Sequence, residues 1–332
     1  MKQDTDSLNS KQKIRAGVIG VGHLGQYHVQ KYEAMPEVDL VGVMDIDRER
    51  AESIARRYGT RTFERHDDLL EMVDCVSLAV PTEDHYALSM DILSRGVHLL
   101  VEKPITCLSD QARRLIALAS EKGLVLQVGH VERFNPAVRR METLLNRPVF
   151  IESHRLSPFT SRGTDVDVVL DLMIHDLDII FHSVGSEIRE LHAVGMTVLT
   201  EKTDIANVRI IFENGTAANL TASRVSNKAL RKIRIFQPDT YLSVDCLKRE
   251  LSMTRLDGNT VGEDPCPPRI STEKWRYPES DPLADQIRAF VDAVARGTPP
   301  VVSGRDGLRA LDAALAINEQ IERGSKNFQA LG

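Results

Sequence analysis

Between residues 13 and 131 the sequence alternates short β-branched runs with longer helical stretches, and this alternation limits the possible folds more than any other feature. The expected strands are residues 14–20, 38–45, 75–81, 97–104 and 124–131, and the expected helices are residues 24–35, 47–59, 83–96 and 109–123. Continuous apolar strands separated by helices are typical of a parallel sheet covered on both faces. This part of the chain therefore predicts a doubly wound α/β domain, over residues 13–133.

The pattern changes after Asn135-Pro136, where strands begin to follow one another closely. A short helix, a strand at 150–159 and a helix at 171–182 precede a series of strands between 191 and 256, with turn signals at Asn214-Gly215 and Pro238-Asp239. Such spacing is typical of an antiparallel sheet. We expect an α+β domain over residues 134–332, with a long loop at 257–282 and two amphipathic helices at 283–296 and 305–323. Residues 1–12 are expected to form a disordered tail.

Composition restricts the classes of partner. The 332 residues include 42 Lys and Arg against 48 Asp and Glu, so the chain lacks the basic excess needed to bind nucleic acid or an anionic membrane surface. The four cysteines are scattered without a CxxC pair, which favours free thiols in a reducing cytoplasm. Neither a secretory signal nor an apolar run of about 18 residues occurs, so we expect a cytoplasmic protein without a membrane span.

A glycine-rich turn follows the first expected strand and opens the first expected helix. Gly20, Gly22 and Gly25 form a GxGxxG motif around His23 and Leu24. In such a motif the first glycine permits the turn, the second lets the backbone approach a pyrophosphate, and the third allows close helix packing. The motif in this context predicts dinucleotide binding, with a simple glycine turn as the alternative.

Asp45 ends the second expected strand, twenty residues after Gly25. A carboxylate there bonds the ribose hydroxyls of the adenosine and repels a 2′-phosphate, so NAD is favoured over NADP. Arg48 leaves NADP or dual use open. A helix N-cap is the structural alternative for Asp45.

A lysine and a carboxylate emerge where the strand at 97–104 ends, in the tripeptide Glu102-Lys103-Pro104. Ligands of open α/β sheets bind at the carboxyl ends of the strands. Taken alone, the tripeptide is equally compatible with an exposed charge pair.

The motifs together resemble the glucose-fructose oxidoreductase / inositol dehydrogenase family, called Gfo/Idh/MocA. They are the GxGxxG opening, the acidic residue after the second strand, Val80-Pro81-Thr82 with His85, Glu-Lys-Pro, and DxxxHxxD on a later helix. The resemblance implies a Rossmann domain, an α/β domain with a largely antiparallel sheet, and hydride transfer between NAD(P) and a sugar or polyol carbon. It implies Lys103, Asp171 and His175 as catalytic residues, and a dinucleotide lined by Gly20, Gly22, His23, Leu24, Gly25, Asp45, Pro81, Thr82, His85, Glu102 and Lys103.

Longer phrases, including LVLQVGHVERFNPAV and DVDVVLDLMIHDLDII, resemble the branch of this family associated with lipid A synthesis. That likeness implies oxidation of the 3-hydroxyl of UDP-N-acetylglucosamine to a ketone. The alternatives are a dehydrogenase of another sugar, inositol or UDP-sugar, and an NAD-binding regulator without catalysis. The resemblance also implies a homodimer or homotetramer.

The stretch DLMIHDLDIIFH places Asp171, His175, Asp178 and His182 on one face of an α-helix, at about 100° per residue. The rest of the circumference is almost entirely apolar, so the helix is expected to be largely buried. His175 and His182 lie seven residues apart, roughly 10 Å, so the four cannot ligate one metal ion, although a two-ligand site completed from elsewhere is an alternative.

Alcohol oxidation needs a base with a pKa near neutrality, which favours His175 as the general base. Asp171 is expected to orient the substrate or the histidine, and Lys103 to stabilise the developing alkoxide. The reverse assignment, with Lys103 as the proton carrier, is the alternative. Asp178 and His182 are expected to be core hydrogen-bonding residues. Substrate contacts are expected from Asp171, His175 and a pool of polar side chains, namely Arg133, Asn135, His154, Arg155, Arg162 and Arg224, with residues 157–167 as a mobile loop.

Overall fold

The computed structural model describes residues 13–160, 166–257 and 269–329, which form two compact units. Within these ranges, the first unit comprises residues 13–102, 114–127 and 287–301, and the second comprises residues 103–113, 128–286 and 302–329. The predicted domain boundary after residue 133 stays a prediction. The predicted tail at residues 1–12 lies outside the described residues.

The first unit is built on a six-stranded sheet with the order β3-β2-β1-β4-β5-β6. Its strands are β1 (Ile14–Ile19), β2 (Val38–Met44), β3 (Arg61–Thr62), β4 (Cys75–Leu78), β5 (His98–Glu102) and β6 (Leu126–Gly129). β1 pairs in parallel with both β2 and β4, so the strand order reverses beside β1. The predicted doubly wound sheet is confirmed, and ligands of such sheets bind where the order reverses.

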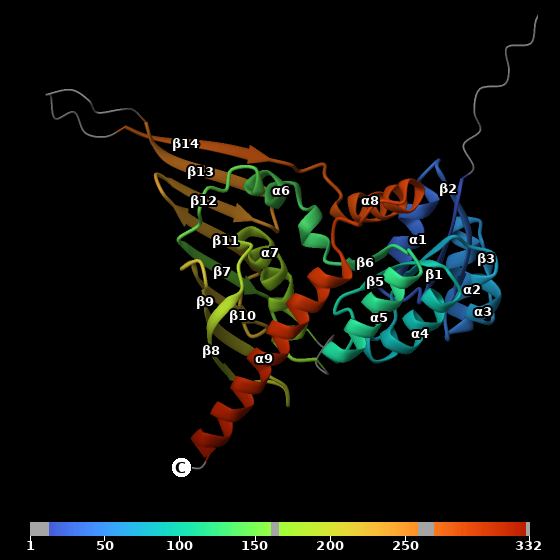
Figure 1. Ribbon diagram of the computed structural model, residues 1–332, viewed down its shortest axis with the longest axis horizontal. Helices are drawn as coiled ribbons and strands as arrows, with labels where there is room; N and C mark the ends of the chain where they lie inside the picture. The colour runs from blue at the N-terminus through green and yellow to red at the C-terminus, as the bar shows by residue number, and fades with distance from the viewer. Residues whose placement is uncertain (1–12, 161–165, 258–268, 330–332) are drawn as a thin grey trace, which may run out of the picture. The chain divides into compact units, whose positions relative to one another are not determined.

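Helices cover both faces of this sheet. They are α1 (Gly25–Glu33), α2 (Arg48–Tyr58), α3 (His66–Leu70) and α4 (Thr82–Ser94), together with parts of α5 (Ser109–Glu121) and α8 (Pro282–Arg296). Figure 1 shows α1 and α4 on opposite faces. The Asp47 side chain caps α2 by accepting from Arg50 N, and Gly59 ends the helix in the left-handed region at φ 63°. β3 and α3 were not predicted, because they have only two and five residues and are too short to show a hydrophobic periodicity.

The second unit contains an eight-stranded sheet with the order β14-β13-β12-β11-β7-β10-β9-β8. The strands are β7 (Phe150–Leu156), β8 (Ile188–Met196), β9 (Ile205–Phe212), β10 (Ala217–Ser223), β11 (Leu230–Gln237), β12 (Thr240–Asp245), β13 (Glu250–Asp257) and β14 (Arg269–Arg276). β7 and β10 run parallel, while β7 is antiparallel to β11. The predicted largely antiparallel sheet is confirmed.

The prediction of a loop at residues 257–282 is wrong for residues 269–276, because they form β14 and pair with β13 over eight residues. β14 lies at the edge of the sheet and has the sequence RISTEKWR. Charged residues are common on edge strands because they discourage pairing with other chains, and they hide the apolar alternation that identifies a strand.

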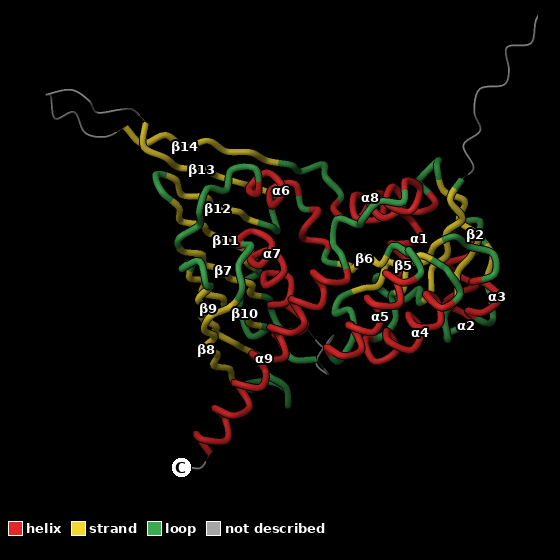
Figure 2. The backbone as a smooth tube through the Cα atoms, in the orientation of Figure 1, coloured by secondary structure: helices red, strands yellow, loops and turns green. Residues whose placement is uncertain are grey.

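Helical segments of the second unit pack on one face of its sheet (Figure 2). They are the 3₁₀ turn η1 (Val131–Phe134), α6 (Pro136–Glu142), the π-helical turn η2 (Val169–Met173), α7 (Ile174–Val184) and α9 (Gly304–Gln329). Leu177 and Ile180 of α7 and Ile317 of α9 join the apolar core with inward residues of the strands. Each such side chain contributes about 1.5–3 kcal/mol when fully buried. The prediction that the helix at 171–182 is largely buried is confirmed.

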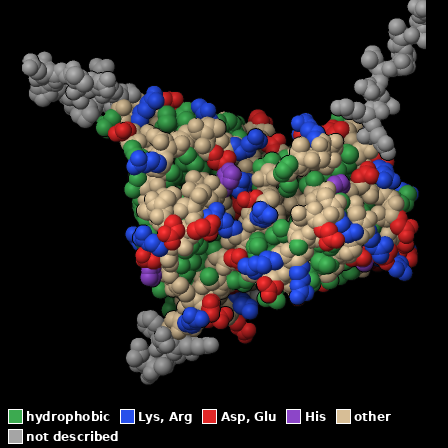
Figure 3. All heavy atoms as spheres, in the orientation of Figure 1, with side chains coloured by type: hydrophobic (Ala, Val, Ile, Leu, Met, Phe, Trp, Pro, Cys, Tyr) green, Lys and Arg blue, Asp and Glu red, His purple; other side chains and the backbone are tan. Residues whose placement is uncertain are grey.

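On the face seen in Figure 3, Lys and Arg side chains are interspersed with Asp and Glu, so this face carries mixed charge. Among the described helices, none combines the length and the apolar character needed to cross a bilayer.

Candidate active site

The glycine-rich turn forms one wall of a pocket of about 560 Å³ in the first unit. Gly20 adopts a φ of +83°, and a Cβ there would lie 2.6 Å from the carbonyl oxygen of Ala79. A Cβ on Gly25 would lie 1.9 Å from the carbonyl oxygen of Gly20, so the turn and the start of α1 pack without room for a side chain. The first and third glycines of the motif are therefore required by the fold itself.

Gly22 differs, because a Cβ there would meet only Arg50 Nη1, at 3.9 Å. Gly22 lines the pocket, and α1 begins at Gly25 without a side-chain cap from its N-cap residue Leu24. His23 and Leu24 are exposed. An open backbone beside an uncapped helix N-terminus suits a pyrophosphate group. The space above Gly22 thus fits the dinucleotide that the motif predicts.

Asp45 lines the same pocket and fixes the turn. Its Oδ2 accepts from Val21 N at 2.7 Å, and its Oδ1 accepts from Asp47 N at 2.9 Å. Arg50 Nη1 lies 3.6 Å from Oδ1. Ile46, beside it in the pocket, is 94% exposed and offers an apolar surface to a planar base. The pocket therefore combines an acceptor for ribose hydroxyls with an apolar platform, as an adenosine requires.

The other predicted cofactor residues of the first unit have different surroundings. Pro81 lines the pocket and precedes Thr82, the first residue of α4. His85 is buried and its Nε2 lies 3.0 Å from the carbonyl oxygen of Val80, so it supports the turn that carries Pro81. Glu102 is buried and its Oε1 lies 3.1 Å from Nε2 of His28 on α1. The assignments of His85 and Glu102 to the cofactor stay predictions.

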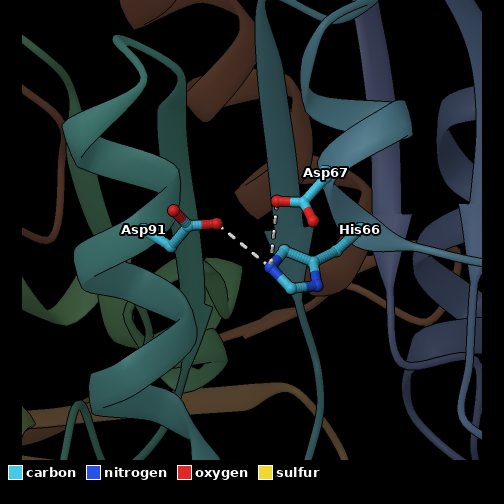
Figure 4. Close-up of side chains that lie close together, drawn as sticks. All are labelled: His66, Asp67 and Asp91. Atoms are coloured by element: carbon cyan, nitrogen blue, oxygen red, sulfur yellow. Dashed lines mark hydrogen bonds and ion pairs between the residues drawn. The ribbon is translucent and has the colours of Figure 1, made fainter.

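A histidine and two aspartates beside the pocket could be taken for a metal site (Figure 4). His66 Nε2 lies 3.0 Å from Asp91 and 3.9 Å from Asp67. Arg65 and Arg95 both pair with Asp67, and Arg95 Nε also lies 3.1 Å from Asp91. Two guanidinium groups thus balance the two carboxylates. The two carboxylates are therefore already paired with positive charges, which is the compensation that a metal ion would otherwise provide.

In the second unit, Lys103 contacts Asp171 twice. Its Nζ donates to the carbonyl oxygen of Asp171 at 2.7 Å and to its Oδ1 at 3.3 Å. Asp171 lies in the π-helical turn, so the angle of 100° per residue that the sequence suggested does not hold at this position. A π-helical turn interrupts the regular α-helical ladder, which lets a carbonyl there accept from a side chain. Asp167 holds the start of the turn by accepting from Val169 N and Leu170 N, each at 2.9 Å.

His175 lies on α7, four residues after Asp171, and is partly buried. Its ring lies edge-on to that of His130, with centroids 6.1 Å apart, and its buried Nδ1 has no hydrogen-bond partner among the described residues. Burial, and then the positive charge of Lys103, hold the pKa of His175 well below its usual value. The imidazole is therefore neutral at pH 7 and able to accept a proton.

Asp178 and His182 continue along α7 as the sequence predicted. Asp178 is buried and pairs with Arg133 at 3.4 Å, while His182 Nε2 lies 3.6 Å from Glu142. Burial raises the pKa of Asp178 to about 7, although Arg133 offsets part of the effect. Arg133 also approaches Glu142 at 3.7 Å. These contacts agree with the prediction of Asp178 as a core hydrogen-bonding residue. His182 is exposed, so its prediction as a core residue is wrong.

Beneath α7 lies a buried network that holds two of the predicted substrate residues. Arg155 donates to Asp176 at 2.6 Å and to Glu132 at 3.0 Å. Asn135 donates to Glu132 at 3.1 Å and to the carbonyl oxygen of Cys246 at 2.9 Å, and it caps α6. With Arg133, these residues are buried against internal partners, so their role as substrate contacts stays a prediction without support from the geometry.

The remaining members of the predicted pool lie in other places. His154 and Arg155 are successive residues of β7 and point to opposite faces of the sheet. Arg224 is buried, donates to the carbonyl oxygen of Val166 and lies 3.8 Å from Asp204. Arg162 and residues 161–165 of the loop expected at 157–167 lie outside the described residues. Among the described residues, Cys75, Cys107 and Cys246 form no disulfide.

Sequence reasoning missed Asp176, Glu132 and Arg50, which hold key positions in the two units. Asp176 gave one signal, since within residues 171–182 it is the only polar residue outside the face of Asp171, His175, Asp178 and His182. A buried carboxylate requires a partner, which is Arg155 here. Burial alone would raise the pKa of Glu132, but Arg155 and Arg231 outweigh it and the pKa is lowered. Glu132 is thus an ionised centre of the network.

Comparisons with known proteins agree with this architecture. Residues 14–130 match the family model described as "Oxidoreductase family, NAD-binding Rossmann fold", and residues 138–238 match the "GFO/IDH/MocA C-terminal domain". Together the two models cover both the glycine-rich turn and the helix that carries Asp171 and His175.

Individual relatives match over nearly the whole chain. The UDP-N-acetylglucosamine 3-dehydrogenase of Acidithiobacillus ferrooxidans is 41% identical over 310 residues, which are 93% of this chain and 97% of the relative. A solved structure of that enzyme has a TM-score of 0.88 at 40% identity, covering 94% of this chain and 98% of the other. The scyllo-inositol 2-dehydrogenase (NAD(+)) of Bacillus subtilis is 25% identical and covers 95% of this chain and 96% of the relative.

Proposed function

Because the chain belongs to the Gfo/Idh/MocA family of NAD-binding oxidoreductases, we propose that it oxidises a sugar hydroxyl with NAD as the hydride acceptor. The proposed substrate is UDP-N-acetylglucosamine, oxidised at its 3-hydroxyl to the 3-keto sugar. The substrate rests on the 41% identity to the dehydrogenase of that sugar nucleotide over 93% of the chain.

The contact that carries the proposed chemistry is the one between Lys103 and Asp171, with His175 one turn further along. An ammonium group, a carboxylate and a neutral imidazole are thereby gathered at one helical segment of the second unit. Alcohol oxidation needs a cation beside the forming alkoxide and a base for the hydroxyl proton. These three side chains supply that set.

Each side chain has a proposed role. His175 accepts the hydroxyl proton, because its lowered pKa keeps the imidazole neutral at pH 7. Lys103 donates a hydrogen bond to the reacting oxygen and stabilises its negative charge. Asp171 orients Lys103 and the sugar through its carboxylate. The reverse order, with Lys103 as the proton carrier, is the alternative that pH profiles of the variants distinguish.

The first unit fits NAD, which supplies the nicotinamide ring that takes up the hydride. Gly22 leaves room for the pyrophosphate, and the uncapped start of α1 offers backbone N–H donors to it. Asp45 offers its carboxylate to the adenosine ribose, and the exposed Ile46 offers an apolar surface to the adenine. The same carboxylate disfavours the 2′-phosphate of NADP.

A panel of substrates tests the proposal. Purified protein with NAD is mixed with UDP-N-acetylglucosamine, UDP-glucose, free N-acetylglucosamine or myo-inositol, and reduced nicotinamide is followed by absorbance. We expect reduction with UDP-N-acetylglucosamine, and mass spectrometry of the product should show the loss of two hydrogen atoms. Repeating the assay with a substrate deuterated at C3 should transfer deuterium to the nicotinamide, which identifies the carbon that is oxidised.

Other outcomes would favour the alternatives. Reduction with inositol alone would contradict the proposed substrate and place the chain beside its inositol dehydrogenase relatives in activity. Binding of NAD without turnover on any of these compounds would favour a regulator. A cytoplasmic location, a homodimer or homotetramer and a place in lipid A synthesis stay predictions, and the oligomeric state is tested by light scattering on the purified protein.

A further inference from the structure

Arg231 is the first residue of strand β11 on the core-facing side of the sheet. Successive residues of a strand alternate between faces, so Arg231 shares its face with Ile233 and Ile235, which are buried in the core. Arg231 pairs directly with Arg155 of β7 in the antiparallel register. Both arginines therefore lie near the ends of their strands, on the core-facing side of the sheet that α7 covers.

Both arginines bond the carboxylate of Glu132, but they differ in burial and in the number of their contacts. Arg155 is buried and bonds Asp176 at 2.6 Å and Glu132 at 3.0 Å. The side chain of Arg231 is 47% exposed, and its Nη1 donates one hydrogen bond of 3.4 Å to the same Oε1 of Glu132. Glu132 keeps Arg155 and Asn135 as partners if Arg231 turns away. Arg231 therefore has a guanidinium group available for a ligand at little cost to the network.

Ion pairs connect this guanidinium to the segment of α7 that carries the proposed base. Arg231 is one of the charges that lower the pKa of His175, after burial, Lys103, Arg155 and His130. The chain of contacts from Arg231 through Glu132 and Arg155 reaches Asp176, the neighbour of His175 in sequence. An anionic part of a substrate whose hydroxyl meets His175 would come within the field of Arg231.

We propose that Arg231 binds the diphosphate of the sugar nucleotide and thereby selects an activated sugar over a free one. The inference rests on the proposed function, because it takes the reacting hydroxyl to be at His175. In UDP-N-acetylglucosamine the diphosphate is attached at C1, two carbons from C3, so the reacting carbon and the phosphates are near one another. A guanidinium group can bond two phosphate oxygens in parallel, which a lysine cannot do.

Substitution of Arg231 provides the test, with Arg234 as the matched control. Arg234 lies on the same strand but on the opposite face, and pairs with Glu152 at 3.1 Å. We expect Arg231→Gln to raise the KM for UDP-N-acetylglucosamine about 10- to 100-fold while kcat changes much less, as the loss of a charge-assisted bidentate contact implies. Arg231→Lys should recover part of the affinity, and Arg234→Gln should behave as the wild type.

Calorimetric titration of UDP into protein saturated with NAD separates this inference from the proposed function. Saturation with NAD keeps UDP out of the cofactor pocket. Wild-type protein should bind UDP more tightly than uridine, and Arg231→Gln should lose that difference at an unchanged melting temperature in the presence of NAD. Such a loss in protein that fails to oxidise any sugar would support the diphosphate contact and contradict the proposed function. Equal KM and equal UDP affinity in wild type and Arg231→Gln, or a wild type that does not bind UDP, would overturn the inference.

Discussion

The ammonium group of Lys103 is held by the main chain of Asp171 as well as by its carboxylate, at 2.7 Å and 3.3 Å respectively. A main-chain acceptor cannot rotate away, so the position of Lys103 depends on the π-helical turn that presents the carbonyl. Asp167 and its bonds to the start of that turn are thus part of the support for the proposed catalytic lysine.

Lys103→Ala should reduce kcat for sugar oxidation by about 10²- to 10⁴-fold, because the forming alkoxide loses its cation. The charge of Lys103 also lowers the pKa of His175, so the acid limb of the remaining activity should move to higher pH. Asp171→Asn keeps the main-chain contact and should cost less than Lys103→Ala. Steady-state kinetics between pH 5 and 9 measure all three effects, and near-normal turnover by Lys103→Ala would contradict the assignment.

His175→Asn should lower kcat by a similar factor and remove the acid limb of the pH profile. In the wild type the base must be neutral, and burial keeps its pKa well below the usual value. Activity should therefore persist as pH falls through 6.5 and decline only below it. An acid limb above pH 7 in the wild type would speak against His175 as the base and in favour of Lys103.

Gly22→Ala and Gly25→Ala should fail for different reasons. A Cβ at Gly22 has open space, so the variant should fold with a melting temperature near that of the wild type but lose the stabilisation that NAD provides. A Cβ at Gly25 would lie 1.9 Å from the carbonyl oxygen of Gly20, so this variant should melt several degrees lower even without NAD. Thermal unfolding of both variants with and without NAD decides the matter. Full NAD stabilisation of Gly22→Ala would show that the pyrophosphate lies elsewhere.

Asp45→Asn should shift the choice of cofactor toward NADP. It removes the charge that repels a 2′-phosphate, while an amide oxygen can still accept from Val21 N or Asp47 N. Arg50, at 3.6 Å from the carboxylate, then gains an anion to pair with. The ratio of kcat/KM for NAD to that for NADP should fall about 10- to 100-fold. Arg48→Gln is the control, because Arg48 is exposed and pairs with Glu52 and Glu64.

Asp178→Asn should alter the pH dependence of stability. The folded protein raises the pKa of Asp178 to about 7, so between pH 4 and 7 folding takes up a proton and the free energy of unfolding falls as pH rises. The variant lacks this group, so its melting temperature relative to the wild type should improve by a few degrees from pH 5 to pH 8. Asp110→Asn, at an exposed position, is the control. A constant difference between wild type and Asp178→Asn would contradict the raised pKa.

Much of the fold could be predicted because its signals are local. The alternation of apolar strands and helices specified the doubly wound sheet, and the spacing of Gly20, Gly22 and Gly25 specified a turn whose close contacts the structure confirms. The apolar circumference of the helix from 171 to 182 predicted its burial. These features depend on residues within one turn or one strand of each other, so the sequence alone contains them.

The partners of charged side chains were decided by the tertiary structure. Arg133, Asn135 and Arg155 had the chemistry of substrate contacts, yet each is buried against residues that the sheet and α7 bring to it from 3 to 111 positions away. Arg231 gave no local signal, because its partner Glu132 lies 99 positions away in the sequence. A charge shows in sequence that it needs a partner, but which partner it meets depends on strand register and packing. For this chain, the sequence determined the fold and the residues suited to catalysis, while the tertiary structure decided which charges stabilise the core and which remain available to a ligand.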